Sequence, residues 1–306
     1  MSRLNQLFAS LFPKKGRMDN ITIINGVVVS GDINKYKNED YGPVVEHPIK
    51  FDTFSSVSIS GPWETVISQG DEIAIRIEIN EKLIPFLKSK TVKGCFNITV
   101  EKDVLINPVM KLFITAPLLE TIAHNGSGKV DIQNFKQEKI NIKKSGTGKC
   151  DLTGDFDVIS LDVSGTGSFD AKINAYEATV NKASTGDCFI SGRVLNSVFN
   201  ISGTGSFEYE GDAAQSIKIK QDSIGSSTFE GTCENLDLNT SGTGSVNAKG
   251  LKSDNVTLIS SGIGKVKVTA LKSIVGSSTG IGGIHIFGNP ANARVTKKSI
   301  GELVYH

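Results

Sequence analysis

The sequence predicts an all-β protein whose main part is a β-solenoid. Three observations support this prediction. A glycine-containing turn recurs about every 19 residues, apolar and polar residues alternate between the turns, and the chain has 32 glycines but only 8 prolines. Frequent glycine with little proline is typical of many tight turns in a regular array, not of a flexible linker.

The repeated turn is a tetrapeptide whose commonest sequence is Ser-Gly-Thr-Gly. Its ten copies begin at residues 125, 145, 164, 183, 202, 222, 241, 261, 279 and 298. Steps of 18 to 20 residues are too short for most helical repeats and fit one coil of a β-solenoid. Residues 125–306 are therefore expected to form ten coils, stacked about 4.8 Å apart.

Each coil is expected to bury alternate side chains of two strands, one after the turn and one before the next turn. A third inward row follows the second corner of the coil and contains Phe135, Phe156, Leu195, Cys233, Leu251 and Leu271. Cys150 and Cys188 occupy the inward column after the turn, and no two cysteines lie closer than 38 residues. We therefore expect buried free thiols and no metal or redox motif.

The third residue of the turn forms a column of its own. It is serine at Ser127, threonine in five copies (Thr147, Thr166, Thr185, Thr204, Thr243) and isoleucine in four (Ile224, Ile263, Ile281, Ile300). A column that mixes threonine with isoleucine predicts a half-buried ladder of β-branched side chains. The alternative is that regularly spaced hydroxyl groups bind sugar or ice.

Residues 18–50 are expected to form a β-hairpin and a linker. Two apolar runs flank Asn25-Gly26, which is typical of a hairpin with a type I′ turn. The polar stretch that follows, up to Lys50, shows no periodicity.

Residues 51–124 are expected to cap the leading end of the solenoid with strands and one helix. Apolar and polar residues alternate from Ile73 to Ile79, which predicts a half-buried strand. A helix is expected from Glu81 to Ser89, although it contains Pro85.

Residues 1–17 are expected to form an amphipathic helix. Its apolar stripe consists of Leu4, Leu7, Phe8, Leu11 and Phe12. One interpretation is that the stripe packs on the solenoid as an end cap. The other is that it contacts a membrane surface or a partner protein, helped by basic neighbours such as Lys14 and Lys15. These five apolar residues are the only contact site that the sequence suggests.

The order of these elements resembles the auto-transporter adhesin head domains called GIN domains. The matching residues are Phe54, Val57, Ile59, Gly61, Val66, Ile67, Gln69, Gly70, the strand Ile73–Ile79, the segment Leu83–Leu87, the serial Ser-Gly-Thr-Gly turns and Phe287-Gly288-Asn289-Pro290. The resemblance covers about residues 50–306. It implies a right-handed parallel β-helix and an adhesin-like role at the cell surface, with no established activity.

The charge balance and the N-terminal sequence indicate which partners and which location are expected. The chain has 33 basic and 32 acidic residues, with arginine at only five positions, which argues against nucleic acid as a partner. No run of 18 apolar residues is present. Lys14 and Lys15 follow the short apolar stretch Leu7–Phe12, the reverse of the order in a secretory signal. A cytoplasmic location is therefore expected, with the cell surface as the family-based alternative.

The sequence predicts no catalytic residue, no metal ligand and no cofactor. The turn recurs at 19 residues and not at the nine of calcium-binding repeats, and no Gly-Lys-Ser/Thr phosphate loop occurs. The four histidines are scattered, and Asp155 and Asp157 are interpreted as solvated corner residues.

The sequence therefore predicts a non-enzymatic, adhesin-like or scaffold rod that acts by contact with a protein or a glycan. The alternatives are a carbohydrate-active enzyme, which would need a cleft with two or three carboxylates, and a membrane-associated scaffold that uses the N-terminal helix. Open strand edges at the ends of a solenoid also predict end-to-end self-association.

Overall fold

The computed structural model describes residues 22–24, 27–29, 40–102, 108–298 and 300–306. The N-terminal helix predicted over residues 1–17, with its five apolar residues, lies outside the described residues. Strands β1 (Thr22–Ile24) and β2 (Val27–Val29) pair antiparallel on either side of Asn25-Gly26. The larger of two compact units comprises residues 41–103 and 108–306. No helix among the described parts of the chain is long and apolar enough to span a membrane.

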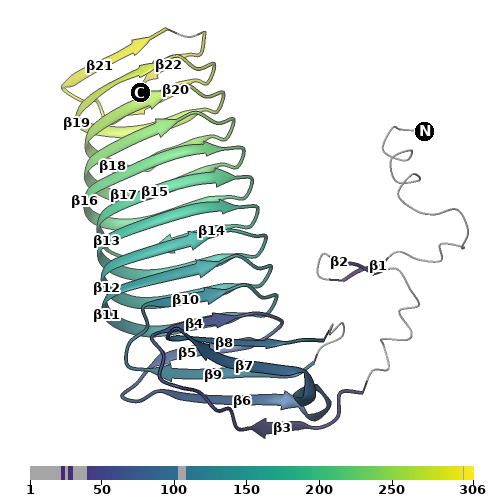
Figure 1. Cartoon of the computed structure of the whole chain (residues 1–306). Coiled ribbons are helices and arrows are strands. Elements are labelled where there is room, and N and C mark those ends of the chain that lie inside the picture. Colours follow the sequence, from purple (N-terminus) through teal and green to yellow (C-terminus); the bar gives the residue numbers. More distant parts are fainter. Residues whose placement is uncertain (1–21, 25–26, 30–39, 103–107, 299) are drawn as a thin grey trace, which may run out of the picture. The chain divides into compact units, whose positions relative to one another are not determined.

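Most of the larger unit is a parallel β-solenoid, whose coils stack one on another in Figure 1. Its strands are β10 (Thr121–His124), β11 (Val130–Lys144), β12 (Cys150–Val163), β13 (Phe169–Ser184), β14 (Cys188–Ser191), β15 (Val194–Gly203), β16 (Phe207–Ser223), β17 (Ser227–Thr240), β18 (Val246–Ser260), β19 (Val266–Ser278), β20 (Ile284–Phe287), β21 (Asn292–Lys297) and β22 (Leu303–Tyr305). Equivalent residues pair between neighbouring coils, as Val130 with Cys150 and Cys150 with Phe169. The predicted all-β solenoid with about 19 residues per coil is confirmed.

The N-terminal end of the solenoid is covered by antiparallel strands. β4 (Ser56–Ile59) and β5 (Glu64–Gln69) continue the parallel stack beneath β10 and β11. β3 (Val44–His47), β6 (Ala74–Asn80), β7 (Leu87–Val92), β8 (Cys95–Val100) and β9 (Met110–Ala116) complete this region. β6 pairs antiparallel with both β3 and β9, and β7 pairs antiparallel with β8. β8 and β9 pair parallel with β4 and β5, so β6 and β7 run against the direction of the coils and the region is a mixed layer.

The helix predicted from Glu81 to Ser89 is shorter and of a different type. A 3₁₀ helix spans Glu81–Phe86, and β7 begins at Leu87. Pro85 explains the early end, because proline lacks the backbone N–H and its ring crowds the preceding turn.

The C-terminal coil lacks a covering layer among the described residues. β21 pairs with β19 alone and β22 pairs with β20 alone. Three residues of this coil pair with buried isoleucines of the preceding coil, yet Ala293 is exposed, Leu303 is only half-buried and Tyr305 is 49% exposed. Within the part of the chain that the structure describes, the two ends thus differ: further strands cover one, and no strand pairs with the outer edge of β21 and β22 at the other.

The core consists of columns in which apolar side chains stack on apolar side chains. The cysteines predicted to be buried are so: Cys150, Cys188 and Cys233 are free thiols in the core, and Cys95 is half-buried. Burial raises the pKa of the Cys150 and Cys188 thiols to about 12. Because the thiolate is the reactive form, these two cysteines are inert packing residues.

The third inward row is only partly as predicted. Phe135, Phe156, Cys233 and Leu251 are buried, but Leu195 is half-buried and Leu271 is 44% exposed. Val194 and Ala270 are buried in their place. The corner offers two alternative inward positions and has room for one large side chain, as the Phe156 ring occupies the space of a side chain at Gly154. The buried position of this row therefore differs by one residue between coils.

The turn column is also different from the prediction. Every residue from Ser127 to Ile300 at the third turn position is exposed, and the four isoleucines are 57% to 85% exposed. The predicted half-buried ladder is wrong. Glycines on either side bring successive turns into backbone contact, so that a Cβ at Gly146 would collide with the Gly126 carbonyl. The third side chain therefore points to solvent.

Polar side chains line the inner side of the same turns. Lys144 and Lys182 are 1% exposed. The Lys144 Nζ donates to the carbonyl oxygens of Gly146 (2.9 Å) and Gly167 (2.6 Å). The Lys182 Nζ donates to those of Ser184 (3.1 Å) and Gly205 (3.0 Å). Buried carbonyl oxygens need hydrogen-bond donors, and each lysine donates to carbonyl oxygens of two neighbouring coils. Burial lowers the pKa of both amines.

Candidate binding site

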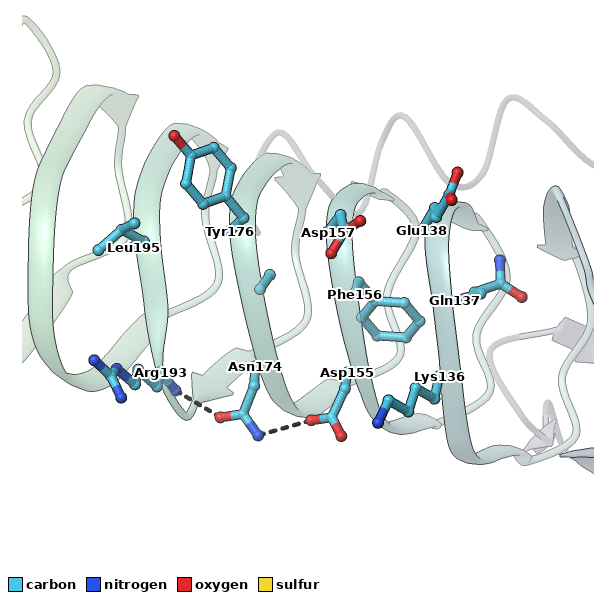
Figure 2. Close-up of a pocket in the computed structure, with 11 residues that line it drawn as sticks. Lys136, Gln137, Glu138, Asp155, Phe156, Asp157, Asn174, Tyr176, Arg193 and Leu195 are labelled. Carbon is cyan, nitrogen blue, oxygen red and sulfur yellow. Dashed lines mark hydrogen bonds between the residues drawn. The ribbon is translucent and has the colours of Figure 1, made fainter.

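A surface hollow of about 670 Å³ crosses four coils at the second corner (Figure 2). It is formed by β11, β12, β13 and the start of β15. The pairing places Lys136 beside Asp155 and Asp155 beside Asn174. Two outward rows result, with a buried aromatic floor between them.

The first row is a ladder of polar groups: Lys136, Asp155, Asn174 and Arg193. The Asn174 Nδ2 donates to Asp155 Oδ1 at 2.8 Å, and the Arg193 backbone N–H donates to Asn174 Oδ1 at 3.2 Å. Figure 2 shows this ladder along one side of the hollow, with the two cationic side chains at its ends. These hydrogen bonds hold the Asp155 carboxylate and the Asn174 amide in place, and Arg193 takes part through its backbone N–H.

Arg193 owes its position to the tight turn that precedes it. Gly192 has a φ of 119°, a left-handed conformation that favours glycine, and its backbone N–H bonds to the Glu210 carbonyl of the next coil at 3.0 Å. A Cβ at Gly192 would collide with the Ile173 carbonyl. The short connection between β14 and β15 therefore presents Arg193 at the rim.

The second row contains Glu138, Asp157, Tyr176 and Leu195. Tyr176 is 55% exposed and is the only large apolar side chain that is exposed among the described residues from 126 to 220. Phe156, 5% exposed, lies between the rows and forms the floor. The hollow thus combines one exposed aromatic ring with carboxylate, amide and guanidinium groups.

This combination fits the recognition of hydroxyl-rich molecules. Carboxylates accept from ligand hydroxyls, the amide both accepts and donates, and the guanidinium donates up to five hydrogen bonds. An exposed tyrosine offers a flat apolar face and a polar tip, a pairing suited to ligands that have both apolar and polar surface. A sugar chain, with apolar C–H faces and hydroxyl edges, has the complementary surface.

The same hollow contains three carboxylates, the groups that a glycosidase would use. Glu138, Asp155 and Asp157 are all exposed, and Asp155 already accepts a hydrogen bond from Asn174. The general acid of a glycosidase depends on an apolar, desolvated setting that keeps its proton at neutral pH. Carboxylates in open solvent lack that setting, so the hollow is better suited to binding than to bond cleavage.

The sequence identified the hollow only in part. Asp155 and Asp157 are exposed, as the sequence predicts for solvated corner residues, but they belong to different rows of one site. Tyr176 was missed. The signal was present, because an aromatic residue follows Glu138 and Asp157 in an outward column. Among the described residues, no group of three or more histidine, cysteine or acidic side chains is placed to hold a metal ion.

Comparison with known proteins supports the fold. No curated protein sequence matches the chain significantly. A "putative lipid binding protein" from Parabacteroides distasonis is 17% identical, with a TM-score of 0.50 over 87% of this chain and 97% of that chain. A "putative adhesin" from Bacteroides fragilis is 18% identical over 86% and 97%, with a TM-score of 0.35. A "putative adhesin" from P. distasonis is 15% identical over 87% and 98%, with a TM-score of 0.45.

The family comparison is more informative than the structural neighbours. The sequence signature of one family matches residues 53–220 and 196–290, which together cover most of the chain. This match confirms the resemblance found in the sequence. The chain belongs to the family described as "Putative auto-transporter adhesin, head GIN domain".

Proposed function

We propose that the protein is a non-enzymatic, adhesin-like module that binds a glycan in the hollow around Tyr176. One observation carries this proposal: the exposed ring of Tyr176 stands across the hollow from a hydrogen-bonded ladder of the Asp155 and Asn174 side chains and the Arg193 backbone. The family's description supports a role in adhesion, and such a role favours the cell surface. A cytoplasmic location, which the sequence favoured, finds no support in the family.

The location of the hollow also favours an extended ligand. It crosses four coils, which corresponds to about 14 Å along the solenoid at 4.8 Å per coil. A chain of a few sugar units matches that length. The lining carries three carboxylates against the two cations Lys136 and Arg193, which favours a glycan without acidic groups.

The proposal is tested by screening the full chain against immobilised glycans and titrating the best ligands by calorimetry. Tyr176→Ala should weaken binding by tenfold or more, because truncation of a central aromatic contact costs about 2 kcal/mol. Tyr305→Ala is the matched control, since Tyr305 is similarly exposed but lies in the last coil. If both variants bind as tightly as the wild type, or if no glycan is retained, the hollow is not a glycan site.

A carbohydrate-active enzyme is the second candidate, because three carboxylates line the hollow. It is distinguished by incubating the retained glycan with the protein and measuring new reducing ends. Binding without release supports the adhesin. If reducing ends are released by the wild type but not by Asp157→Asn, the protein is a carbohydrate-active enzyme and the adhesin proposal is wrong.

The apolar stripe Leu4, Leu7, Phe8, Leu11 and Phe12 stays a prediction as a membrane or partner contact. Sedimentation with liposomes, using the chain with and without residues 1–17, tests it. Loss of binding on deletion supports membrane contact, and equal behaviour of the two forms contradicts it.

A further inference from the structure

The turns of the last five coils form an exposed apolar strip. We define the turn strip as residues 222–224, 241–243, 261–263, 279–281, 298 and 300. Its third column is isoleucine in four of five coils, with exposures of 69% at Ile224, 59% at Ile263, 57% at Ile281 and 85% at Ile300. Such a row of large exposed side chains in a soluble protein usually marks a contact surface.

The turn strip differs from the equivalent surface of the first five coils. There the third column contains only serine and threonine, and no exposed isoleucine occurs among the described residues from 126 to 220. The same bend pattern carries threonine in one half and isoleucine in the other, as at Thr147 and Ile263, so turn geometry does not require isoleucine. The apolar surface is therefore a separate property of the last five coils.

The first column of the turn strip supplies the clue to what covers it. This column is Asp222, Ser241, Ser261, Thr279 and Lys298. Its only charges stand at its two ends and have opposite signs. Asp222 and Lys298 are exposed, and neither forms an ion pair with another described residue. Four coil steps separate them, about 19 Å along the solenoid.

Such a strip is complementary to itself when it is reversed. If a second copy faces it antiparallel, with the two-fold axis at the middle coil, Asp222 of each copy meets Lys298 of the other. Ile263 then meets Ile263, and Ile224 meets Ile300. Because both copies have the same coil spacing, all five levels match together. This is the residue-to-residue reciprocity of a two-fold interface.

We infer that two copies of the chain associate side by side and antiparallel through the turn strip, with Ile263 at the two-fold axis. The isoleucines provide the apolar contact, and the Asp222–Lys298 pairs select the antiparallel register. The surface lies on the side of the solenoid, so this contact is distinct from end-to-end association and independent of the hollow around Tyr176.

Sedimentation velocity of the full chain over a range of concentrations tests the apolar contact. The wild type should form a dimer. Ile263→Ser should raise the dimer dissociation constant at least about tenfold, because the side chain is buried twice at the axis. Leu271→Ser is the matched control, since Leu271 is 44% exposed in a nearby coil but lies outside the turn strip. A wild type that remains monomeric at every concentration overturns the inference.

A charge exchange tests the register. Asp222→Lys and Lys298→Asp should each weaken the dimer about tenfold, because each places like charges at two symmetric positions. The double variant restores opposite charges and should dimerise as the wild type does. If the single variants dimerise normally, or if the double variant stays as weak as the single ones, the antiparallel register is wrong.

Two further outcomes identify other occupants. A dimer that survives all these changes but is lost in Val295→Pro, which removes an N–H from the free strand β21, would show that the contact is end to end. A monomeric wild type that sediments with neutral liposomes, and loses this in Ile263→Ser, would show that the strip binds lipid. Either result overturns the side-by-side dimer.

Discussion

The first five coils (residues 125–221) and the last five (residues 222–306) share one backbone plan but distribute their chemistry in opposite ways. Inside the turns, the first half carries Lys144, Lys182 and Gln221, and the last half carries Thr240, Ser260 and Ser278. Outside the turns, the first half shows hydroxyl groups and the last half shows isoleucines. The solenoid therefore sets the spacing of side chains and leaves their chemistry free to differ along its length.

The difference inside the turns has a physical cause. Turn carbonyls that face inward must be satisfied, and long side chains do this across two coils. Gln221 has the same role as the lysines, since its Nε2 donates to the carbonyls of Gly225 (3.3 Å) and Ser245 (3.5 Å). In the last half, short hydroxyls bond to one another between neighbouring coils, as the Thr240 hydroxyl does in donating to Ser260 Oγ at 3.3 Å. The first half thus depends more heavily on single side chains.

The largest expected effect is the loss of one buried lysine. Lys182→Ala should lower the free energy of unfolding by about 4 kcal/mol, because it leaves a cavity and removes the donor from two buried carbonyls. Lys182→Gln should cost only about 1 kcal/mol, since glutamine fills the same role at Gln221. Chemical denaturation measures both. Equal losses would show that the charge, and not the hydrogen bonds, is what the turn requires.

The next effect is a dependence on acid at the N-terminal end of the solenoid, beside Lys144. His124 stands in the same inner column and is 1% exposed, and burial together with the nearby Lys144 charge lowers its pKa from 6.5 to about 4. Between these values the unfolded chain binds the proton and the folded chain does not. Stability should therefore fall as the pH drops from about 6.5 to 4, by up to about 3 kcal/mol.

Thermal unfolding at a series of pH values checks this dependence. His124→Gln should flatten the curve between pH 6.5 and 4, and His47→Gln, outside the solenoid, serves as control. A slope that is unchanged in His124→Gln would assign the acid sensitivity to other groups.

The smallest expected effect concerns the outer column. Thr147→Ile, Thr166→Ile and Thr185→Ile together should change the free energy of unfolding by only about 0.5 kcal/mol, because exposed side chains contribute little. Denaturant titration measures this change. A gain well above 1 kcal/mol would revive the half-buried ladder that the mixed column suggested.

The sequence predicted the coil period, the parallel stack and most inward columns, because one backbone geometry repeated ten times leaves the same pattern ten times. The prediction of buried and exposed positions failed where one residue type can have two physical roles. Lys144 and Lys182 continue an alternating inward pattern, but a charged residue suggests solvent unless the inward carbonyls are known. Ile263 suggests packing, although its turn has no layer outside it. Tyr176 can be recognised as part of a site only when the fold is known, because the site is formed by residues from four coils.

The free edge of β21 and β22 also affects how the protein opens. Each coil contacts only its neighbours, so local unfolding begins where a neighbour is missing. Amide hydrogen exchange should therefore be fastest in β21 and β22 and slow progressively toward the antiparallel strands at the other end. Lys298 and Ile300 belong to this fraying coil. A second copy that contacts them would protect the last coil from exchange. Slow exchange in this coil would therefore indicate that the chain has associated.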